Sequence, residues 1–115
     1  MRSVLQTILA VDDDPVVLDL LAASFEGATV TASGVAEAER LLRDQRFTRV
    51  VSDLNLGDGD GITVLLAARD LQPWARRWLI TGDPDERSVR AVATGLAERV
   101  IRKPWTLDEL RGVAP

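Results

Sequence analysis

The chain has 115 residues, enough for one domain with a buried core, and it contains no cysteine, which excludes disulfides and thiolate metal sites. Hydrophobic residues make up 46% and charged residues 28%, a balance typical of a globular chain rather than a disordered one. Histidine is also absent, which excludes imidazole chemistry on this chain, and the net charge of −4 disfavours direct nucleic-acid binding.

The N-terminal segment does not resemble a signal peptide. It carries one arginine, and its apolar run is interrupted by Gln6 and Thr7. No apolar stretch is long enough to span a bilayer, and we see no linker or repeat. We therefore expect a cytoplasmic protein with a single domain over residues 1–115 and no membrane partner.

The first predicted strand is the apolar run 8–11, of the kind that is buried on both faces of a sheet. Asp14 is the predicted N-cap of the following helix, with Pro15 at its first position and Gly27 as its C-terminal stop. The predicted apolar face of this helix consists of Val17, Leu20, Leu21 and Phe25.

Two more strand–helix units follow. Strand 29–32 leads to a helix that Ser33 is expected to cap and whose buried side consists of Ala38, Leu41 and Leu42. Strand 50–52 ends at Asp53, and a turn-forming run with three glycines then leads to Asp60, the predicted cap of a third helix. Ile62, Leu65 and Leu66 form the apolar face of that third helix.

The last two units have the same pattern. Strand 78–80 places Trp78 in the core, and Asp83 followed by Pro84 predicts the start of the fourth helix. Its predicted apolar face consists of Val89, Val92, Ala93 and Leu96, and Gly95 is expected to end or weaken it. After strand 100–101, Thr106 and Glu109 have the spacing of a capping box for a short last helix.

Five strands alternating with helices predict an α/β fold, a (βα)5 three-layer sandwich with a parallel sheet and right-handed crossovers. In such sheets ligands bind beyond the carboxyl ends of the strands. Four of the five strand ends there carry acidic, hydroxyl or ammonium groups: Asp12 and Asp13, Asp53, Thr81, and Lys103.

Two carboxylates about 4 Å apart repel by about 4 kcal/mol at an effective dielectric constant of about 20. With three at one edge, either one is protonated or a cation lies among them. A site of oxygen ligands without histidine or cysteine favours Mg²⁺ or Mn²⁺. A cation beside a carboxylate, a hydroxyl and a lysine suits phosphoryl transfer. In that chemistry Asp53 would be the nucleophile, Lys103 would pair with the phosphoryl oxygens, and Thr81 would donate a hydrogen bond to one of them.

In their order and spacing, four motifs resemble the receiver domains of two-component response regulators. These motifs are Val11-Asp12-Asp13-Asp14-Pro15, Asp53-Leu54-Asn55-Leu56 through Asp60-Gly61, Ile80-Thr81-Gly82, and Lys103-Pro104-Trp105. The resemblance covers essentially the whole chain and implies a flavodoxin-like sheet with strand order 2-1-3-4-5.

The resemblance also implies a role for each site residue. Asp53 is the expected phosphoacceptor, and Mg²⁺ is held by Asp13, Asp53, the backbone carbonyl of Asn55 and, through a water, Asp12. Thr81, Gly82 and Lys103 form the phosphoryl-binding and switching set. The donor is a phosphohistidine on a sensor histidine kinase or histidine phosphotransfer protein, because this chain has no histidine.

Two positions depart from the family pattern. Gly57 replaces a common proline, so the loop after Asp53 costs more entropy to order. Val100 stands where an aromatic side chain usually swings inward when the site is phosphorylated, so signal transmission by that route is in question. Val100 and Trp105 are expected on the output face formed by the fourth helix, fifth strand and fifth helix. Arg87 and two neighbouring arginines are interpreted as solvated charge.

Asp83 has two predicted roles, as a helix cap and, by the resemblance, as a partner of Asn55 beside the path of water to the acyl phosphate. We hypothesise that this polar pair permits fairly quick self-dephosphorylation. The partners of the chain are then a phosphodonor protein, an output domain or target protein, and a second copy of the chain as a candidate homodimer.

Two alternatives remain. The Asp12-Asp13-Asp14-Pro15-Val16 run also fits the Asp-x-Asp-x-Val pattern of haloacid dehalogenase-like phosphatases, in which Asp12 would be the nucleophile, although it leaves Asp53 without a role. In the second alternative, the chain is a receiver-like interaction module whose partner binding does not depend on phosphate. The main interpretation is a signalling receiver that acts as an enzyme only on its own phosphorylation and dephosphorylation.

Overall fold

Seven strands and five helices follow one another along residues 6–111, the part of the chain that the computed structural model describes. The strands are β1 (Thr7–Val11), β2 (Ala28–Ala32), β3 (Arg49–Asp53), β4 (Asn55–Leu56), β5 (Gly59–Asp60), β6 (Arg76–Thr81) and β7 (Arg99–Arg102). The helices are α1 (Pro15–Ser24), α2 (Val35–Asp44), α3 (Gly61–Leu71), α4 (Glu86–Ala93) and α5 (Leu107–Arg111). Within residues 6–111, no helix has the length and apolar character needed to cross a membrane.

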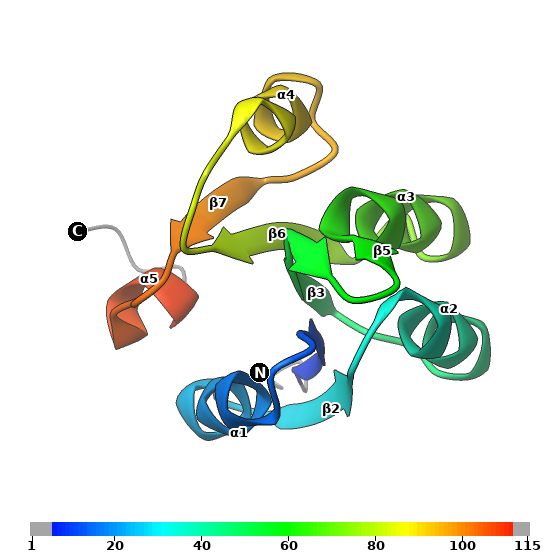
Figure 1. The fold of residues 1–115 in the computed structure, drawn as a ribbon. Coiled ribbons are helices and arrows are strands. Elements are labelled where there is room, and N and C mark those ends of the chain that lie inside the picture. The colour runs from blue at the N-terminus through cyan, green and yellow to red at the C-terminus, as the bar shows by residue number, and fades with distance from the viewer. Residues whose placement is uncertain (1–5, 112–115) are drawn as a thin grey trace, which may run out of the picture.

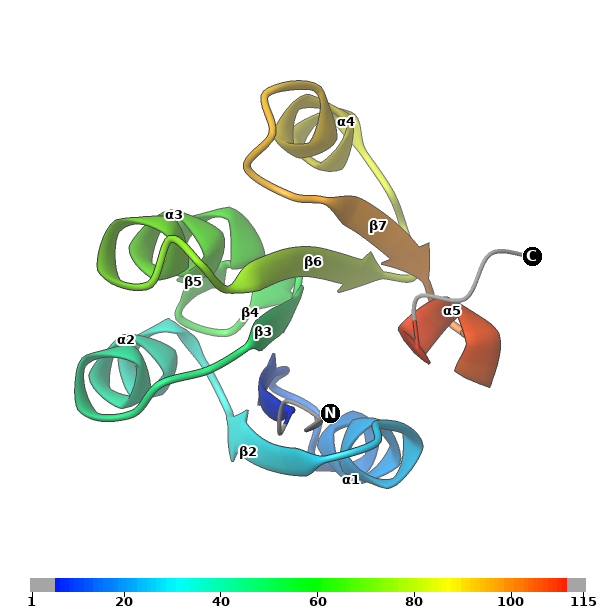
Figure 2. The same ribbon diagram turned by 180° about the vertical axis from the view of Figure 1, so that it is seen from behind.

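The five long strands form one parallel sheet in the order β2-β1-β3-β6-β7. This is the predicted order 2-1-3-4-5, because β6 and β7 are the fourth and fifth strands of the sheet along the chain. Helices α1 and α5 cover one face, and α2, α3 and α4 cover the other (Figures 1 and 2). The strand order reverses between β1 and β3, which is where ligands of such sheets bind.

Alternating strand residues fill the two cores. Ile8 and Ala10 of β1 pack in the cluster with α1 and α5, whereas Leu9 and Val11 pack in the cluster with α2, α3 and α4. Trp78 is fully buried in the α1–α5 cluster, which confirms its predicted place in the core. Burial on both faces explains why these strands are continuous apolar runs in the sequence.

Two arginines, which are the first residues of β3 and β7, attach α5 to the sheet. The buried Arg49 lies over the ring of Trp78 at 4.2 Å, and its Nη1 donates to the carbonyl oxygen of Leu110 at 3.1 Å. Arg99 donates from its Nη1 to the carbonyl oxygen of Glu109 at 2.9 Å. These bonds fix the helix that follows Lys103 and thereby limit where the lysine loop can lie.

Several predicted apolar faces differ from the observed ones. The following predicted core residues are exposed: Leu20, Leu66, Val89, Val92 and Ala93. Helix α1 buries Leu21 as predicted but turns Leu18 inward in place of Leu20. Helix α4 packs through the small side chains of Ser88 and Ala91. Apolar periodicity shows which residues share a face, but the neighbouring elements decide how much of that face is covered.

The predicted caps Asp14 and Asp60 are confirmed, because their carboxylates accept hydrogen bonds from the N–H groups of residues 16 and 63. The predicted cap Asp83 is wrong: α4 begins two residues later, with Asp85 as its N-cap in a reciprocal capping box with Ser88. The N–H of Asp83 donates to the hydroxyl of Thr81 at 3.1 Å, which keeps it in the loop after β6.

The start of α2 was also predicted incorrectly, since its N-cap residue is Gly34 and not Ser33. The capping carboxylate comes from Asp58, which accepts from the N–H groups of Val35 at 2.8 Å and Ala36 at 3.1 Å. Asp58 lies in the turn between β4 and β5, a short antiparallel hairpin within the stretch expected to be a plain loop. A Cβ at Gly34 would collide with the Asp58 carboxylate, so a larger residue would displace this carboxylate from its capping position.

We expect Asp58→Ala to lower the melting temperature at pH 7, because two N–H groups of α2 lose their acceptor. Those two hydrogen bonds lower the pKa of Asp58 below its ordinary value of 3.8. The contribution of Asp58 is therefore present above pH 3.8 and is lost as the pH falls through the lowered pKa. Thermal unfolding followed by circular dichroism from pH 7 to pH 3 measures the effect.

Asp19→Ala, at an exposed position of α1, is the control for loss of a surface carboxylate. Equal melting temperatures of Asp58→Ala and Asp19→Ala at pH 7 would contradict the prediction.

Candidate functional site

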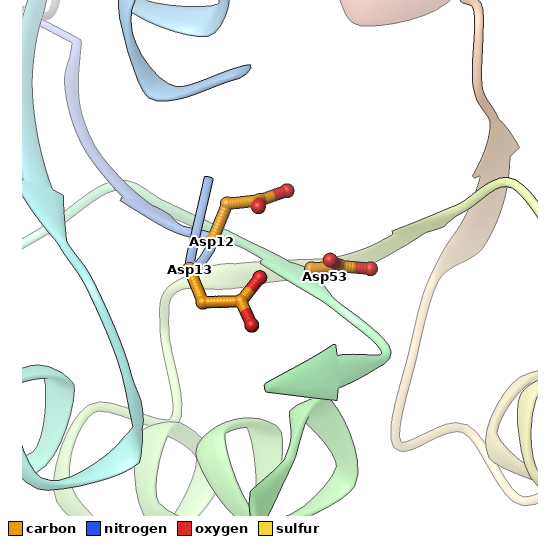
Figure 3. A group of neighbouring side chains, drawn as sticks. All are labelled: Asp12, Asp13 and Asp53. Atoms are coloured by element: carbon orange, nitrogen blue, oxygen red, sulfur yellow. The ribbon is translucent and has the colours of Figure 1, made fainter. Parts of the chain in front are cut away.

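Three carboxylates gather at the carboxyl ends of β1 and β3 (Figure 3). Asp12 and Asp13 directly follow β1, and Asp53 is the last residue of β3. One carboxylate oxygen of each lies within 4.8 Å of the others. Asp12 is fully buried, Asp53 is 9% exposed and Asp13 faces solvent. The predicted acidic cluster is therefore an observed feature of the molecule, placed where the sheet order reverses.

The ammonium group of Lys103 joins two of these acids. Its Nζ donates to Asp12 Oδ2 at 2.8 Å and to Asp53 Oδ2 at 3.2 Å. The other oxygen of Asp12 accepts from the N–H of Asp14 at 2.8 Å. Lys103 directly follows β7, and its own N–H donates to the carbonyl oxygen of Thr81 at 2.9 Å. The sheet register thus delivers the lysine to the same edge as the acids.

Burial and neighbouring charge set the ionisation of this group. Burial raises the pKa of Asp53 above its ordinary value of 3.8, the charge of Asp12 raises it further, and Lys103 only partly opposes both. Burial disfavours the Lys103 ammonium, but its contacts with Asp12 and Asp53 outweigh this and raise the pKa of the lysine. The lysine therefore stays charged, while the cluster around it remains short of positive charge.

The end of β6 supplies a hydroxyl. Thr81 is buried, and its oxygen accepts from the N–H of Asp83 at 3.1 Å, which leaves the hydroxyl proton available to a ligand. Gly82 is exposed beside the lysine, and a Cβ built there would lie 4.0 Å from Lys103 Cβ. The side chain of Asp83 is exposed in the loop that follows.

The first turn of α3 closes in behind Asp53. Gly61 begins this helix, and its N–H donates to the carbonyl oxygen of Leu54 at 2.8 Å. A Cβ at Gly61 would collide with the carbonyl oxygen of Asp53, so a larger residue would displace one of the two backbones. Glycine at this position permits α3 to start close to the end of β3.

Asn55 lies two residues after Asp53 and has an unpredicted partner. Its side-chain oxygen accepts from Nη2 of Arg87 at 2.7 Å. Arg87 comes from α4 and also binds Asp85, so it is not the free, solvated charge expected from the sequence. No local pattern in the sequence indicates a contact between residues 32 positions apart.

Val100 and Trp105, both expected on one output face, pack on opposite sides of the sheet. Val100 is half-buried against the cluster of α2, α3 and α4 and pairs with Leu79 in the sheet register. Trp105 packs against the α1–α5 cluster and lines a groove together with Leu20 of α1 and with Lys103. The structure therefore does not bring the two residues together.

The acidic cluster fits a hard divalent cation. Its donors are carboxylate oxygens, and three acids face a single ammonium group, so a bound cation would reduce the remaining repulsion. Both oxygens of Asp12 are already engaged, whereas Asp13 is exposed and offers its carboxylate freely.

We expect Asp53→Asn to raise the melting temperature at pH 7 in the presence of a chelator, because it removes a carboxylate that burial and Asp12 destabilise. Because the pKa of Asp53 is raised in the folded state, the contribution of this group to stability is fully present below pH 3.8. That contribution is lost as the pH rises through the raised pKa. The gain should accordingly disappear at about pH 3.5. Differential scanning calorimetry at both pH values checks this, with the exposed Asp19→Asn as control. A lower melting temperature of Asp53→Asn at pH 7 would refute it.

Comparison with known proteins agrees with this geometry. A family model described as the response regulator receiver domain matches residues 8–114. The chain is similar to the alginate biosynthesis transcriptional regulatory protein AlgB of Pseudomonas putida, with 34% identity over 108 residues that cover 90% of this chain and 24% of AlgB. The chain thus spans about a quarter of the length of this relative.

Two solved structures have a similar fold. The signal receiver domain of an HD domain-containing protein from Pseudomonas fluorescens has a TM-score of 0.84 and 30% identity, covering 96% of this chain and 85% of that one. A response regulator from Burkholderia pseudomallei, solved with a phosphorylated aspartic acid, a calcium ion and citrate, has a TM-score of 0.83 and 29% identity, covering 91% of this chain and 64% of that one. The family match over nearly the whole chain decides the assignment: this protein belongs to the response regulator receiver domain family.

Proposed function

We propose that this receiver domain accepts a phosphoryl group on Asp53 with the help of a bound divalent cation and uses the modified state as a signal. The observation that carries the proposal is the meeting of Asp12, Asp13, Asp53 and Lys103 at one edge of the sheet. The phosphorylated aspartic acid in the Burkholderia pseudomallei relative supports the same chemistry.

In the proposed reaction, a carboxylate oxygen of Asp53 attacks the phosphorus of a phosphohistidine on a partner protein. The new oxygen–phosphorus bond forms as the phosphorus–nitrogen bond breaks, and the imidazole leaves with the electron pair of that bond. Lys103 then shifts its contact from the Asp53 carboxylate to the phosphoryl oxygens. Its Nζ is already within hydrogen-bond distance of Asp53 and is held nearby by Asp12. The hydroxyl of Thr81, whose oxygen accepts from the N–H of Asp83, donates a hydrogen bond to another phosphoryl oxygen beside the backbone of Gly82.

The proposed cation site uses Asp13, Asp53 and the backbone carbonyl of Asn55 as direct ligands. Asp12 acts through a water, which agrees with the engagement of both its oxygens by Lys103 and the N–H of Asp14. When bound, Mg²⁺ or Mn²⁺ would offset the negative charge of the carboxylates and of the incoming phosphoryl group.

Signal transmission is proposed to involve Thr81 and the strand next to it. The sheet register pairs Thr81 with Arg102, one residue before Lys103. A movement of Thr81 would therefore displace the end of β7. Val100 has no ring to exchange between buried and exposed positions, so any transmission through it must use backbone shifts. A phosphate-independent interaction module is the second candidate, and the absence of an aromatic residue at Val100 is the observation that favours it.

The phosphatase alternative has less support. Its proposed nucleophile Asp12 is fully buried with both oxygens engaged. The acids that would have to complete such a site, Asp108 and Glu109, lie at α5, where Glu109 accepts from the N–H of Thr106 at 3.0 Å. We therefore propose that the chain turns over no phosphorylated substrate other than itself.

The proposed partners follow from the family. Response regulators receive phosphoryl groups from histidine kinases, so a sensor kinase or a phosphotransfer protein is the expected donor. The relative AlgB is about four times longer than the segment that matches this chain. We propose that residues 1–115 form one receiver domain, which controls an output domain or a target protein in the cytoplasm. A homodimer is a further proposed form of the signalling state.

We expect acetyl phosphate with Mg²⁺ to add one phosphoryl group to the wild-type chain and none to Asp53→Asn, with Asp53 identified by borohydride reduction and peptide mass spectrometry. Modification of Asp12 instead would favour the phosphatase chemistry. A folded, metal-loaded sample that remains unmodified would overturn the proposal.

We expect Mg²⁺ to stabilise the wild type more than Asp53→Asn, because the variant loses one cation ligand. A free Mg²⁺ concentration about 100 times its Kd would stabilise the folded state by about 2.7 kcal/mol. Urea unfolding with and without Mg²⁺ measures the difference, and equal stabilisation of both proteins would exclude Asp53 from the cation site.

We expect beryllofluoride with Mg²⁺ to change the fluorescence of Trp105, whose ring lines a groove with Lys103. Trp105→Phe identifies the signal. Hydrogen exchange of α4 and β7 on the same samples separates the two candidate functions: unchanged exchange in a beryllofluoride-bound protein would favour the phosphate-independent module.

A further inference from the structure

Arg87 joins the starts of two helices to the phosphoacceptor loop. Its Nη2 donates to Asp85 Oδ2 at 2.8 Å and to Asn55 Oδ1 at 2.7 Å, and its Nη1 lies 3.5 Å from Asp60 Oδ2. Asp85 is the N-cap of α4 and Asp60 the N-cap of α3. Two carboxylates thus hold the guanidinium in place whether or not it contacts Asn55.

This contact defines what the side chain of Asn55 can do. A guanidinium group only donates hydrogen bonds, so the atom that faces it must be the carbonyl oxygen of the Asn55 amide. That oxygen is the sole acceptor on this side chain, and a 2.7 Å contact with a charged donor is a strong hydrogen bond. The amide nitrogen, which can only donate, remains for other contacts.

Loss of the phosphoryl group from Asp53 requires a water that attacks the phosphorus. A nearby acceptor speeds such an attack by orienting the water and drawing on its proton. The amide oxygen of Asn55, two residues from Asp53, is suited to this task only while it is free. The quick self-dephosphorylation hypothesised from the sequence relies on Asn55 and Asp83 as a polar pair, and the contact with Arg87 occupies one member of that pair.

We propose that Arg87 is a positioning residue that prolongs the phosphorylated state by occupying the amide oxygen of Asn55. The inference rests on the proposed phosphorylation of Asp53 and adds a determinant of its lifetime from α4. Strength of the Arg87–Asn55 contact then sets how long the signal lasts, without any change in the residues that bind the phosphoryl group.

The test measures the half-life of phospho-Asp53 in the wild type and in five variants of the whole chain. Each protein is phosphorylated with acetyl phosphate and Mg²⁺ and freed of donor, and the release of inorganic phosphate is then followed. Arg87→Met should shorten the half-life about three- to tenfold, the range for loss of one hydrogen bond. The matched control Arg90→Met, which breaks a surface pair with Glu86 on the same helix, should leave it unchanged.

A double-mutant cycle assigns the effect to Asn55. In an Asn55→Ala background, Arg87→Met should change the half-life by less than about twofold, because no amide oxygen remains to be released. Circular dichroism confirms that each variant is folded. Arg87→Lys keeps a charge beside Asp85 and Asp60, but its side chain is one bond shorter, so its nitrogen does not reach the position from which Nη2 contacts Asn55. It should shorten the half-life in the same direction if Arg87→Met fails to fold.

An unchanged half-life in Arg87→Met and Arg87→Lys overturns the inference, as does equal shortening with and without Asn55. Failure of the proposed function has a different signature, since no variant, the wild type included, would then carry phosphate on Asp53.

Discussion

One ammonium group shared by two carboxylates holds the functional edge of this protein together. Lys103 lies 2.8 Å from Asp12 and 3.2 Å from Asp53, across the gap between the ends of three strands. The pair is partly buried, so its attraction is screened less than that of a surface ion pair. Because Asp13 adds a third negative charge, the balance stays incomplete. The same imbalance that weakens the metal-free site would favour a bound cation and the proposed phosphoryl chemistry.

Backbone fit and side-chain caps fix the segment after Asp53 on three sides. Gly61 permits α3 to begin against the Asp53 carbonyl, Asp58 reaches across to cap α2, and Arg87 ties Asn55 to the start of α4. Each of these contacts connects a helix N-terminus to the same short stretch of chain. The segment after Asp53 is therefore linked through hydrogen bonds to helices on one face of the sheet. Helix α5 is held separately, by the contacts of Arg49 and Arg99.

Prediction from the sequence succeeded where the physical signal is local. Continuous apolar runs located the buried strands, and the caps Asp14 and Asp60 followed from the preference of carboxylates for free N–H groups. It failed for Asp83, where proline imitates a helix start, because the hydroxyl of Thr81 holds this residue in the loop. It also placed Val89 in the core, although α4 packs through smaller side chains.

The sequence by itself determined the five strands of the main sheet, their polar ends and, through the resemblance of its motifs, their order. Those properties depend on residue type and on spacing along a few turns of chain. Tertiary structure alone decided that Asp58 caps a helix 23 residues away and that Arg87 occupies the side-chain oxygen of Asn55 across 32 residues. Contacts of this kind depend on how the helices and loops pack against one another. No periodic pattern in the sequence indicates them.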